Sequence, residues 1–178
     1  MLNLDSTPNW LEESPLIRDA SPHDAETIAA IYNYYILNTT ITFEESEISS
    51  HEVIRRMERV LSADLPYLVL ESNGDVCGYC YLTPWKERSA YRHTLESVIY
   101  LKYTCTGRGY GTQLYQALIR LLMNLDVHAV IAGVALPNPA SIALHKKLGF
   151  IEVALLREVG WKFRRWIDLT YWELMTGV

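Results

Sequence analysis

Hydrophobic residues along the chain follow two spacings, and these spacings predict a mixture of strands and helices. Helical spacing, with apolar residues at i, i+3, i+4 and i+7, is clearest in 28–36 and 114–125. Runs of β-branched, aromatic and apolar residues predict strands instead. We expect strands at 16–18, 66–71, 76–82, 94–101, 128–136, 150–159 and 165–175. We expect helices at 21–38, at 49–61, from the glycine turn at 107–111 to about 125, and at 141–149.

Short polar signals predict where these elements begin and end. Ser21 and Ser49 each precede an acidic residue by three positions, which is the spacing of a capping box at a helix start. The pair Asn73-Gly74 predicts a hairpin turn, so the strands on either side of it should run antiparallel. The stretch 41–45 is rich in β-branched and aromatic residues and is expected to be extended.

One pair of strands should be parallel. The stretch 128–136 is a nearly continuous apolar run, which is typical of a strand buried on both faces. It follows strand 94–101 through a helix, and such a unit implies a parallel pair with a right-handed crossover. The sequence has no internal repeat or interdomain linker. We therefore expect one α/β domain at 15–178 after a flexible lead-in at 1–14.

Composition disfavours several classes of protein. The net charge of -5 argues against a nucleic-acid binder, which would need a basic stripe. No apolar run is long enough to span a membrane, and 1–14 lacks the basic start of a signal peptide. We therefore expect a cytoplasmic protein with no nucleic-acid or membrane partner. Cys77 and Cys80 have no second Cys or His pair to complete a metal site, so we expect reduced thiols and no metal.

A strand, a glycine turn and a helix organise the candidate chemistry. Glu96 lies on the strand, and the turn contains Gly107, Gly109 and Gly111. The first turn of a helix carries free N–H groups and positive potential, so this arrangement favours a bound phosphate. A Walker loop would end in Gly-Lys-Ser/Thr, and a dinucleotide loop would have glycine in place of Thr112. A coenzyme A pyrophosphate site and a plain tight turn are the remaining interpretations.

Motifs along the chain resemble those of the GNAT acyl-CoA N-acyltransferases. That family has a loop Gln/Arg-x-x-Gly-x-Gly/Ala, then Asn-x-x-Ala/Ser at a helix, then a Gly-Phe pair. Here Gly109 and Gly111 match the loop, 138–141 matches the helix start and Gly149-Phe150 matches the pair. Thr106 stands where the family usually has Gln or Arg.

Within this family the chain is most similar to the phosphinothricin acetyltransferase group, over about residues 16–172. The likeness is carried by Ile31-Tyr32-Asn33, Thr42-Phe43-Glu44, Trp85-Lys86, Ala90-Tyr91, Thr94-Leu95-Glu96, Val98, Tyr100, Asn138 to His145, Lys162, Trp166 and Asp168. The resemblance implies a single-domain GNAT-like α/β fold, in which helices flank a mixed, mostly antiparallel sheet with a central splayed parallel pair. A bulge in strand 94–101 would produce the splay.

The resemblance also implies acetyl-CoA as co-substrate. The backbone of 98–100 would pair with the pantetheine arm, and the N–H groups of 106–111 would bind the pyrophosphate. The residues expected to contact the cofactor are Val98, Ile99, Tyr100, Thr106, Gly107, Arg108, Gly109, Tyr110, Gly111, Asn138, Ser141 and Lys147.

Three residues are candidates for catalysis. Acetyl transfer needs a base that takes a proton from the amine and a donor for the thioester oxygen. Glu96 is the candidate base; without the resemblance, an edge carboxylate paired with Arg92 or His93 is an equal alternative. The resemblance makes the N–H of Val98 the candidate donor. His145 is a cofactor contact, an acid for the leaving thiolate, or a structural histidine packed on the sheet.

The acceptor is expected to be a small amine. The residues expected around it are Phe43, Glu44, Thr83, Trp85, Arg88 and Tyr91. We expect direct transfer, in a ternary complex, to the primary amine of an amino-acid-like substrate of the phosphinothricin or methionine sulfoximine type. Alternatives are a polyamine, an aminoglycoside, a protein N-terminus, a non-catalytic acyl-CoA-binding module and a nucleotide-binding protein. The resemblance also suggests a homodimer, with the tyrosine-rich first helix and exposed tryptophans as candidate contacts.

Overall fold

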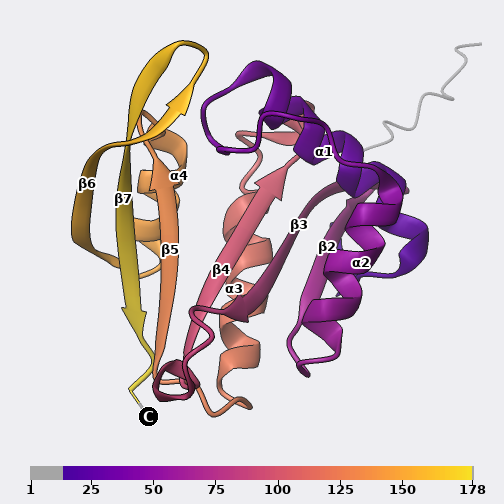
Figure 1. Cartoon of the computed structure of the whole chain (residues 1–178). Helices are drawn as coiled ribbons and strands as arrows, with labels where there is room; N and C mark the ends of the chain where they lie inside the picture. The colour runs from indigo at the N-terminus through magenta and orange to yellow at the C-terminus, as the bar shows by residue number, and fades with distance from the viewer. Residues whose placement is uncertain (1–13, 178) are drawn as a thin grey trace, which may run out of the picture.

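The computed structural model describes residues 14–177. The lead-in predicted at 1–14 therefore lies outside the described residues except for Ser14. Within the described part, a seven-stranded sheet has the order β1-β2-β3-β4-β5-β7-β6 (Figure 1). The strands are β1 Leu16–Asp19, β2 Tyr67–Ser72, β3 Asp75–Pro84, β4 Thr94–Leu101, β5 Ala129–Ala135, β6 Ile151–Lys162 and β7 Arg165–Met175.

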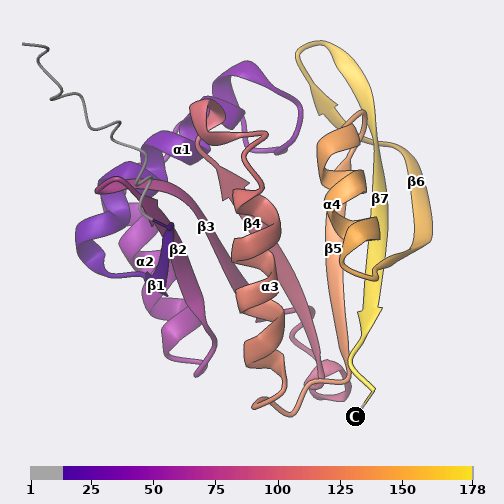
Figure 2. The ribbon, with the colours of Figure 1, turned by 180° about the vertical axis from the view of Figure 1, so that it is seen from behind.

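Helices cover both faces of this sheet. The α-helices are α1 Ala25–Asn38, α2 Ser50–Leu61, α3 Tyr110–Leu122 and α4 Pro139–Lys147, and short 3₁₀ turns lie at Pro22–Asp24, Ser89–Tyr91 and Tyr103–Cys105. α1 and α2 lie on the face seen in Figure 1, and α3 and α4 cover the other face in Figure 2. The expected α/β architecture is confirmed, with all neighbouring strands antiparallel except β4 and β5.

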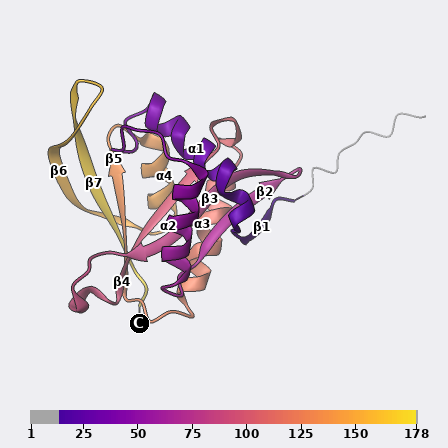
Figure 3. The same cartoon turned by 45° about the vertical axis from the view of Figure 1, so that its right-hand side comes forward.

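The parallel pairing of β4 with β5 is short, so the sheet separates into two halves beyond it. β4 and β5 pair only from Thr94↔Ala129 to Glu96↔Ile131, near the start of both strands. Beyond this point the two halves of the sheet diverge toward the end that carries the β6–β7 hairpin (Figure 3). The splay is confirmed, but the bulge expected to cause it is not found, because the β3–β4 register runs without a shift from Gly78↔Leu101 to Pro84↔Leu95.

Helix starts follow the capping signals, with one correction. The Ser21 N–H donates to Asp24 Oδ2 at 2.8 Å, and the Ser49 hydroxyl accepts from the Glu52 N–H at 3.2 Å. The last helix does not begin at Ser141 as predicted. It begins at Pro139, because Asn138 Oδ1 caps it by accepting from the Ser141 N–H at 3.1 Å, and proline suits the first helical position.

The stretch 41–45, which was expected to be extended, belongs to no β-strand or helix, and Lys162 Nζ of β6 donates to the Thr42 carbonyl at 2.8 Å. One other expectation differs from the structure: β6 continues to Lys162 rather than ending at Val159. The Asn73-Gly74 hairpin is confirmed, and both residues have the positive φ, 54° and 80°, that a type I′ turn requires.

The core lies on both faces of the central strands. Trp172 and Tyr115 are each 1% exposed, and burying a side chain of this kind stabilises the fold by about 2–3 kcal/mol. All three cysteines are buried and free; Cys77 Sγ lies 2.8 Å from Cys105 Sγ, whereas Cys80 contacts the Leu114 carbonyl. Among the described residues, no helix is long and apolar enough to cross a membrane.

Candidate active site

A cleft of about 680 Å³ occupies the space between the diverging strands β4 and β5. Its floor is β4 from Glu96 to Leu101, and its far wall is β5 together with α4. The glycine turn closes one end. The cleft brings together most of the residues predicted to contact the cofactor, namely Val98, Ile99, Tyr100, Thr106, Gly107, Gly109, Gly111, Asn138, Ser141 and Lys147.

The glycine turn has the conformation of an anion cradle. Gly107 and Gly109 have φ values of 77° and 79°, which disfavour any other residue. The first helical bond of α3 runs from the Gln113 N–H to the Gly109 carbonyl at 3.2 Å, so the earlier N–H groups have no intrahelical acceptor. Thr106 was expected to offer its N–H to the pyrophosphate, but this N–H already donates to the Tyr103 carbonyl at 3.3 Å.

Two predicted cofactor residues lie outside the cleft lining. Tyr110 reaches across to β2, where its hydroxyl lies 2.9 Å from Ser72 Oγ. Arg108 is exposed at the turn and does not line the cleft. Asn138 does line the cleft, and its side-chain oxygen is used in capping α4, so the amide nitrogen is the part left for a ligand.

Glu96 lies at the point where β4 and β5 separate. Burial raises the pKa of its carboxyl, and the positive charge of Lys86 opposes this shift. The alternative pairing with Arg92 or His93 is wrong: Arg92 Nη1 donates to the Ser89 carbonyl, and His93 lies 3.2 Å from Asp126. A half-buried carboxylate with a raised pKa, facing a cleft, suits a general base.

The expected role of the Val98 N–H is not met. The Trp85 N–H donates to the Thr94 carbonyl at 3.2 Å, and the Lys102 N–H donates to the Cys77 carbonyl at 2.8 Å. Along a strand, successive residues direct their backbone N–H and C=O groups toward opposite neighbouring strands. The even-numbered residues of β4 therefore form their backbone hydrogen bonds with β3. Val98 therefore turns its N–H toward β3, although the residue lines the cleft.

The odd-numbered residues of β4 turn their backbone groups toward β5 instead. Pairing with β5 ends at Glu96↔Ile131, so Ile99 is the first residue beyond the pairing whose N–H faces the cleft. The Leu101 carbonyl, with the same orientation, accepts a hydrogen bond from the Tyr35 hydroxyl at 2.7 Å. Because no bulge offsets the alternation of β4, the first N–H that faces the cleft beyond the pairing belongs to Ile99, one residue after the predicted Val98.

His145 lies in a buried hydrogen-bonded chain at the back of the cleft. Its Nδ1 is 2.7 Å from the Ser141 carbonyl, which only accepts, so Nδ1 carries the proton. Nε2 then accepts from the Tyr115 hydroxyl at 3.3 Å, and that hydroxyl lies 2.5 Å from Ser97 Oγ. Burial lowers the pKa of His145, which favours the neutral ring. A neutral ring in this chain has no N–H left for a thiolate.

The residues predicted around the acceptor are spread over several elements. Thr83 pairs with Glu96 across the β3–β4 ladder, and Trp85 packs edge-on against Tyr171 at 5.2 Å. Arg88 is exposed just before the 3₁₀ turn Ser89–Tyr91, and Tyr91 is exposed within this turn. None of these four lines the cleft.

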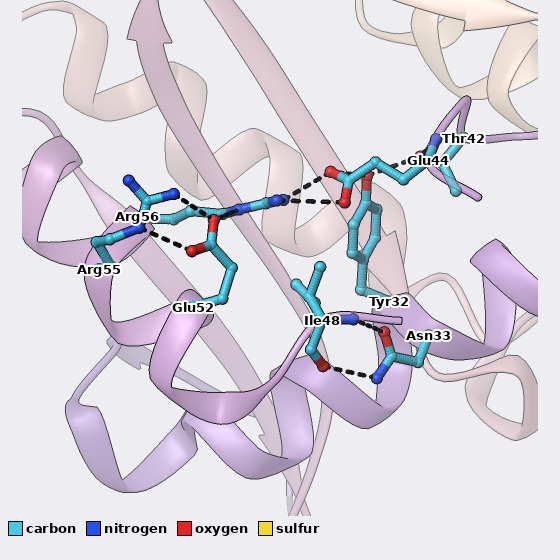
Figure 4. A network of polar contacts seen from close by, with 8 residues as sticks. All are labelled: Tyr32, Asn33, Thr42, Glu44, Ile48, Glu52, Arg55 and Arg56. Atoms are coloured by element: carbon cyan, nitrogen blue, oxygen red, sulfur yellow. Dashed lines mark hydrogen bonds and ion pairs between the residues drawn. The ribbon is translucent and has the colours of Figure 1, made fainter. Parts of the chain in front are cut away.

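Two more predicted acceptor residues lie on the segment between α1 and α2. Phe43 lies over Gly160 of β6, where an added Cβ would overlap its ring. Glu44 forms an ion pair with Arg56 at 2.8 Å (Figure 4).

Sequence reasoning did not assign site roles to several residues at the cleft. Ser97 and Tyr115 connect to His145, and Gly133 of β5 is exposed beside Glu96. An added Cβ at Gly133 would lie 3.9 Å from Glu96 Oε1, so glycine leaves space next to the carboxylate. The apolar run of β5 gave no sign that this position faces a cleft.

Comparison with known proteins gives the family of the chain. The model of the acetyltransferase (GNAT) domain matches residues 17–171. The chain belongs to the GNAT acetyltransferase family. It is similar to the L-amino acid N-acyltransferase MnaT of Escherichia coli (36% identity over 158 residues, 89% of this chain and 92% of that protein). It is also similar to the phosphinothricin N-acetyltransferase of Alcaligenes faecalis (39% over 153 residues, covering 85% and 78%).

This GNAT acetyltransferase has further relatives of the same kind. The L-methionine sulfoximine/L-methionine sulfone acetyltransferase of Salmonella typhimurium is 34% identical over 158 residues, 89% of this chain and 92% of that one. A solved acetyltransferase from Salmonella typhimurium with acetyl-CoA has a TM-score of 0.89 and 33% identity, covering 92% and 95%. A phosphinothricin acetyltransferase from Sinorhizobium meliloti in complex with acetyl-CoA has a TM-score of 0.88 and 33% identity, covering 92% and 89%.

Proposed function

We propose that this GNAT acetyltransferase transfers the acetyl group of acetyl-CoA to the primary amine of a small amino-acid-like acceptor. The observation that supports this most is the continuous cleft from the glycine turn to Glu96. One end offers helix N–H groups to a pyrophosphate, and the other end offers a carboxylate with a raised pKa. Relatives that acetylate amino acids and their analogues support the class of acceptor.

The mechanism is direct transfer in a ternary complex. Glu96 removes a proton from the acceptor ammonium, directly or through one water, and the amine attacks the thioester carbon. The Ile99 N–H donates to the carbonyl oxygen as negative charge develops on it. The C–S bond then breaks, the nitrogen of the new amide gives up its extra proton, and the coenzyme A thiolate takes up a proton to leave as the free thiol. Asn138 and the N–H groups of the glycine turn hold the cofactor, which contains no metal.

In this proposal His145 has a positioning role, because together with Tyr115 it holds the back wall of the cleft. It does not donate a proton to the leaving thiolate. The bonds of its neutral ring are already used by Ser141 and Tyr115. Thr83, Trp85, Arg88, Tyr91, Phe43 and Glu44 surround the acceptor side in this proposal. The Arg88 guanidinium, which is exposed, offers a contact for an acceptor carboxylate.

The experiment is thiol release from acetyl-CoA with a panel of amino acids, comparing the wild type with Glu96→Gln. We expect Glu96→Gln to lose at least about a hundredfold in turnover, the scale of general-base catalysis, while its affinity for coenzyme A is unchanged. Glu58→Gln, an exposed change on α2, is the matched control and should retain wild-type activity. Full activity of Glu96→Gln would contradict the base assignment.

A homodimer is part of the proposal. β6 is the last strand of the sheet, so its outer edge has no neighbouring strand in the described chain. Large apolar side chains at alternating positions of this strand are exposed: Ile151 60%, Val153 47%, Leu155 45%, Val159 52% and Trp161 52%. An exposed apolar row at a sheet edge is typical of a protein interface. In α1, by contrast, Tyr35 packs inward and is only 9% exposed.

A further inference from the structure

The fold pairs the cysteines differently from the Cys-x-x-Cys spacing in the sequence. Cys77 and Cys80 are three positions apart on β3, so their side chains project from opposite faces of the sheet. Cys80 is fully buried, and its thiol lies 3.8 Å from the Leu114 carbonyl. Cys77 instead lies beside Cys105, 28 positions later in the chain, with 2.8 Å between the two sulfur atoms. The structure thus replaces the sequence motif with a different pair of thiols.

Cys105 lies directly before the glycine turn. It is the last residue of the 3₁₀ turn Tyr103–Cys105, and only Thr106 separates it from Gly107. Cys77, by contrast, belongs to β3, which hydrogen-bonds to β2 on one side and to β4 on the other. A covalent bond between the two sulfur atoms would therefore fasten the start of the anion cradle to the sheet.

Backbone and ring contacts already hold these two segments together. The Lys102 N–H donates to the Cys77 carbonyl at 2.8 Å, and the Cys105 N–H donates to the Lys102 carbonyl at 2.8 Å. The Tyr103 ring stacks on Tyr34 of α1, with the ring centroids 4.9 Å apart. Bonded sulfur atoms lie about 2.05 Å apart, so the thiols need to approach by less than about 1 Å. The segments can make this approach without unfolding.

We propose that Cys77 and Cys105 are a redox modification site, at which hydrogen peroxide forms a reversible disulfide that fastens the glycine turn to β3. The two residues are 4% and 7% exposed, so a small oxidant suits the site better than a bulky one. Cys80 takes no part, because it projects from the other face of β3. The site goes beyond the proposed function, since its chemistry needs neither an acceptor nor acetyl transfer.

The reaction balances with one peroxide for each pair of thiols. Burial, together with the neighbouring Cys105, raises the pKa of the Cys77 thiol to about 11, so Cys77 is a weak first nucleophile. The Cys105 sulfur therefore attacks the O–O bond, keeps one oxygen as a sulfenic acid and releases water. The Cys77 sulfur then attacks the Cys105 sulfur, the S–O bond breaks and a second water leaves. Two electrons pass from the sulfur atoms to the peroxide, and a dithiol reductant reverses the bond by thiol–disulfide exchange.

The disulfide is expected to stabilise the fold and to leave the cradle in place. It closes a loop that spans 28 positions and contains β4, so it restricts the unfolded chain. The N–H groups that face an anion come after Gly107, beyond the cross-linked residue. Their positions depend on the positive φ of Gly107 and Gly109, which a small shift at Cys105 does not reverse.

The first experiment maps the bond in the full chain after incubation with hydrogen peroxide. Remaining thiols are alkylated in denaturant, and a chymotryptic digest, which cleaves after Tyr79 and so separates Cys77 from Cys80, is analysed by mass spectrometry. We expect one disulfide between the Cys77 and Cys105 peptides, alkylated Cys80, and loss of the disulfide with dithiothreitol. A Cys77–Cys80 bond, or Cys105 oxidised to a sulfinic acid with no disulfide, would overturn the proposal.

The second experiment compares the oxidised and reduced proteins. Oxidation should raise the midpoint of thermal unfolding by about 5–10 °C in the wild type and in the matched control Cys80→Ala, but not in Cys105→Ser. The affinity for coenzyme A, measured by calorimetry, should be the same before and after oxidation. An unchanged midpoint in the cross-linked wild type, or loss of coenzyme A binding on oxidation, would contradict a bond that fastens an intact cradle. The mapping needs only the wild type, so it decides the pairing even if a variant does not fold.

Discussion

Glu96 is the base in the proposed mechanism, and the groups around it shift the pH at which its carboxyl ionises. Burial raises the pKa of this carboxyl, so the proposed base becomes protonated at a higher pH than an ordinary glutamate. We expect kcat/KM to fall on the acidic side with a midpoint above the ordinary glutamate range. Glu96→Gln should lose this acidic limb along with most of the activity.

The positive charge of Lys86 provides a second test of the Glu96 pKa. Its ammonium lowers the Glu96 pKa against the effect of burial, and it lies 4.4 Å from the Trp85 ring centroid. Lys86→Met should therefore raise the Glu96 pKa and move the acidic limb to higher pH. The measurement is kcat/KM across the acidic range, with Arg120→Met, an exposed change on α3, as the control. A limb that moves to lower pH, or does not move, would contradict this electrostatic coupling.

The sequence could predict which residues gather at the site better than what each one does. Glu96, Ile99 and Asn138 follow from the order of strand, turn and helix. The N–H that faces the cleft lies at Ile99, one residue after the predicted Val98, because β4 lacks the expected bulge. Nothing in 94–101 shows whether the strand contains a bulge.

At the level of elements, the start of α1 depends on a pair of charged residues. Arg18 of β1 contacts Asp24 at 2.7 Å, and Asp24 is 6% exposed. This hydrogen bond lowers the pKa of Asp24. The pair therefore stabilises the fold fully above the ordinary aspartate pKa, and this stabilisation is lost as pH falls through the lowered value.

Asp24→Ala should thus reduce the free energy of unfolding by about 2–3 kcal/mol near pH 7, because it removes charged hydrogen bonds and a cap. The difference from the wild type should shrink at acidic pH, where Asp24 is protonated in both states. Urea unfolding at two pH values measures this, with Glu58→Ala as the control. If the difference in unfolding free energy grew toward low pH, it would contradict stabilisation of the fold by the ionised Asp24 carboxylate.

Element boundaries could be predicted where the signal is local. Asn73-Gly74 and the serines at 21 and 49 specify turns and caps through their own backbone chemistry. The segment 41–45 was expected to be extended, but its path depends on Lys162 and Gly160, more than a hundred residues later. No local pattern contains that information.

At the scale of the whole molecule, the proposed dimer interface lies at the edge strand β6. The ring centroids of Trp161 and Trp166 lie 4.8 Å apart at the β6–β7 hairpin, and the two residues are 52% and 59% exposed. We expect the wild type to be a dimer by light scattering and Trp161→Ser to shift it toward monomer. Met123→Ser, which alters a 76% exposed residue after α3, should leave the dimer unchanged. A monomeric wild type at micromolar concentration would contradict the interface.

The division of the sheet into two halves opens the cleft that is proposed to hold both substrates. β4 and β5 pair over three positions and then separate, which opens the cleft at Glu96 and Ile99. The most direct test is mass spectrometry of the acceptor after incubation with acetyl-CoA and L-methionine sulfone. We expect N-acetylated sulfone in a one-to-one ratio with released thiol, and both products to form at least about a hundredfold more slowly with Glu96→Gln. Thiol release without an acetylated amine, with the sulfone or with any amino acid, would contradict acetyl transfer in this cleft.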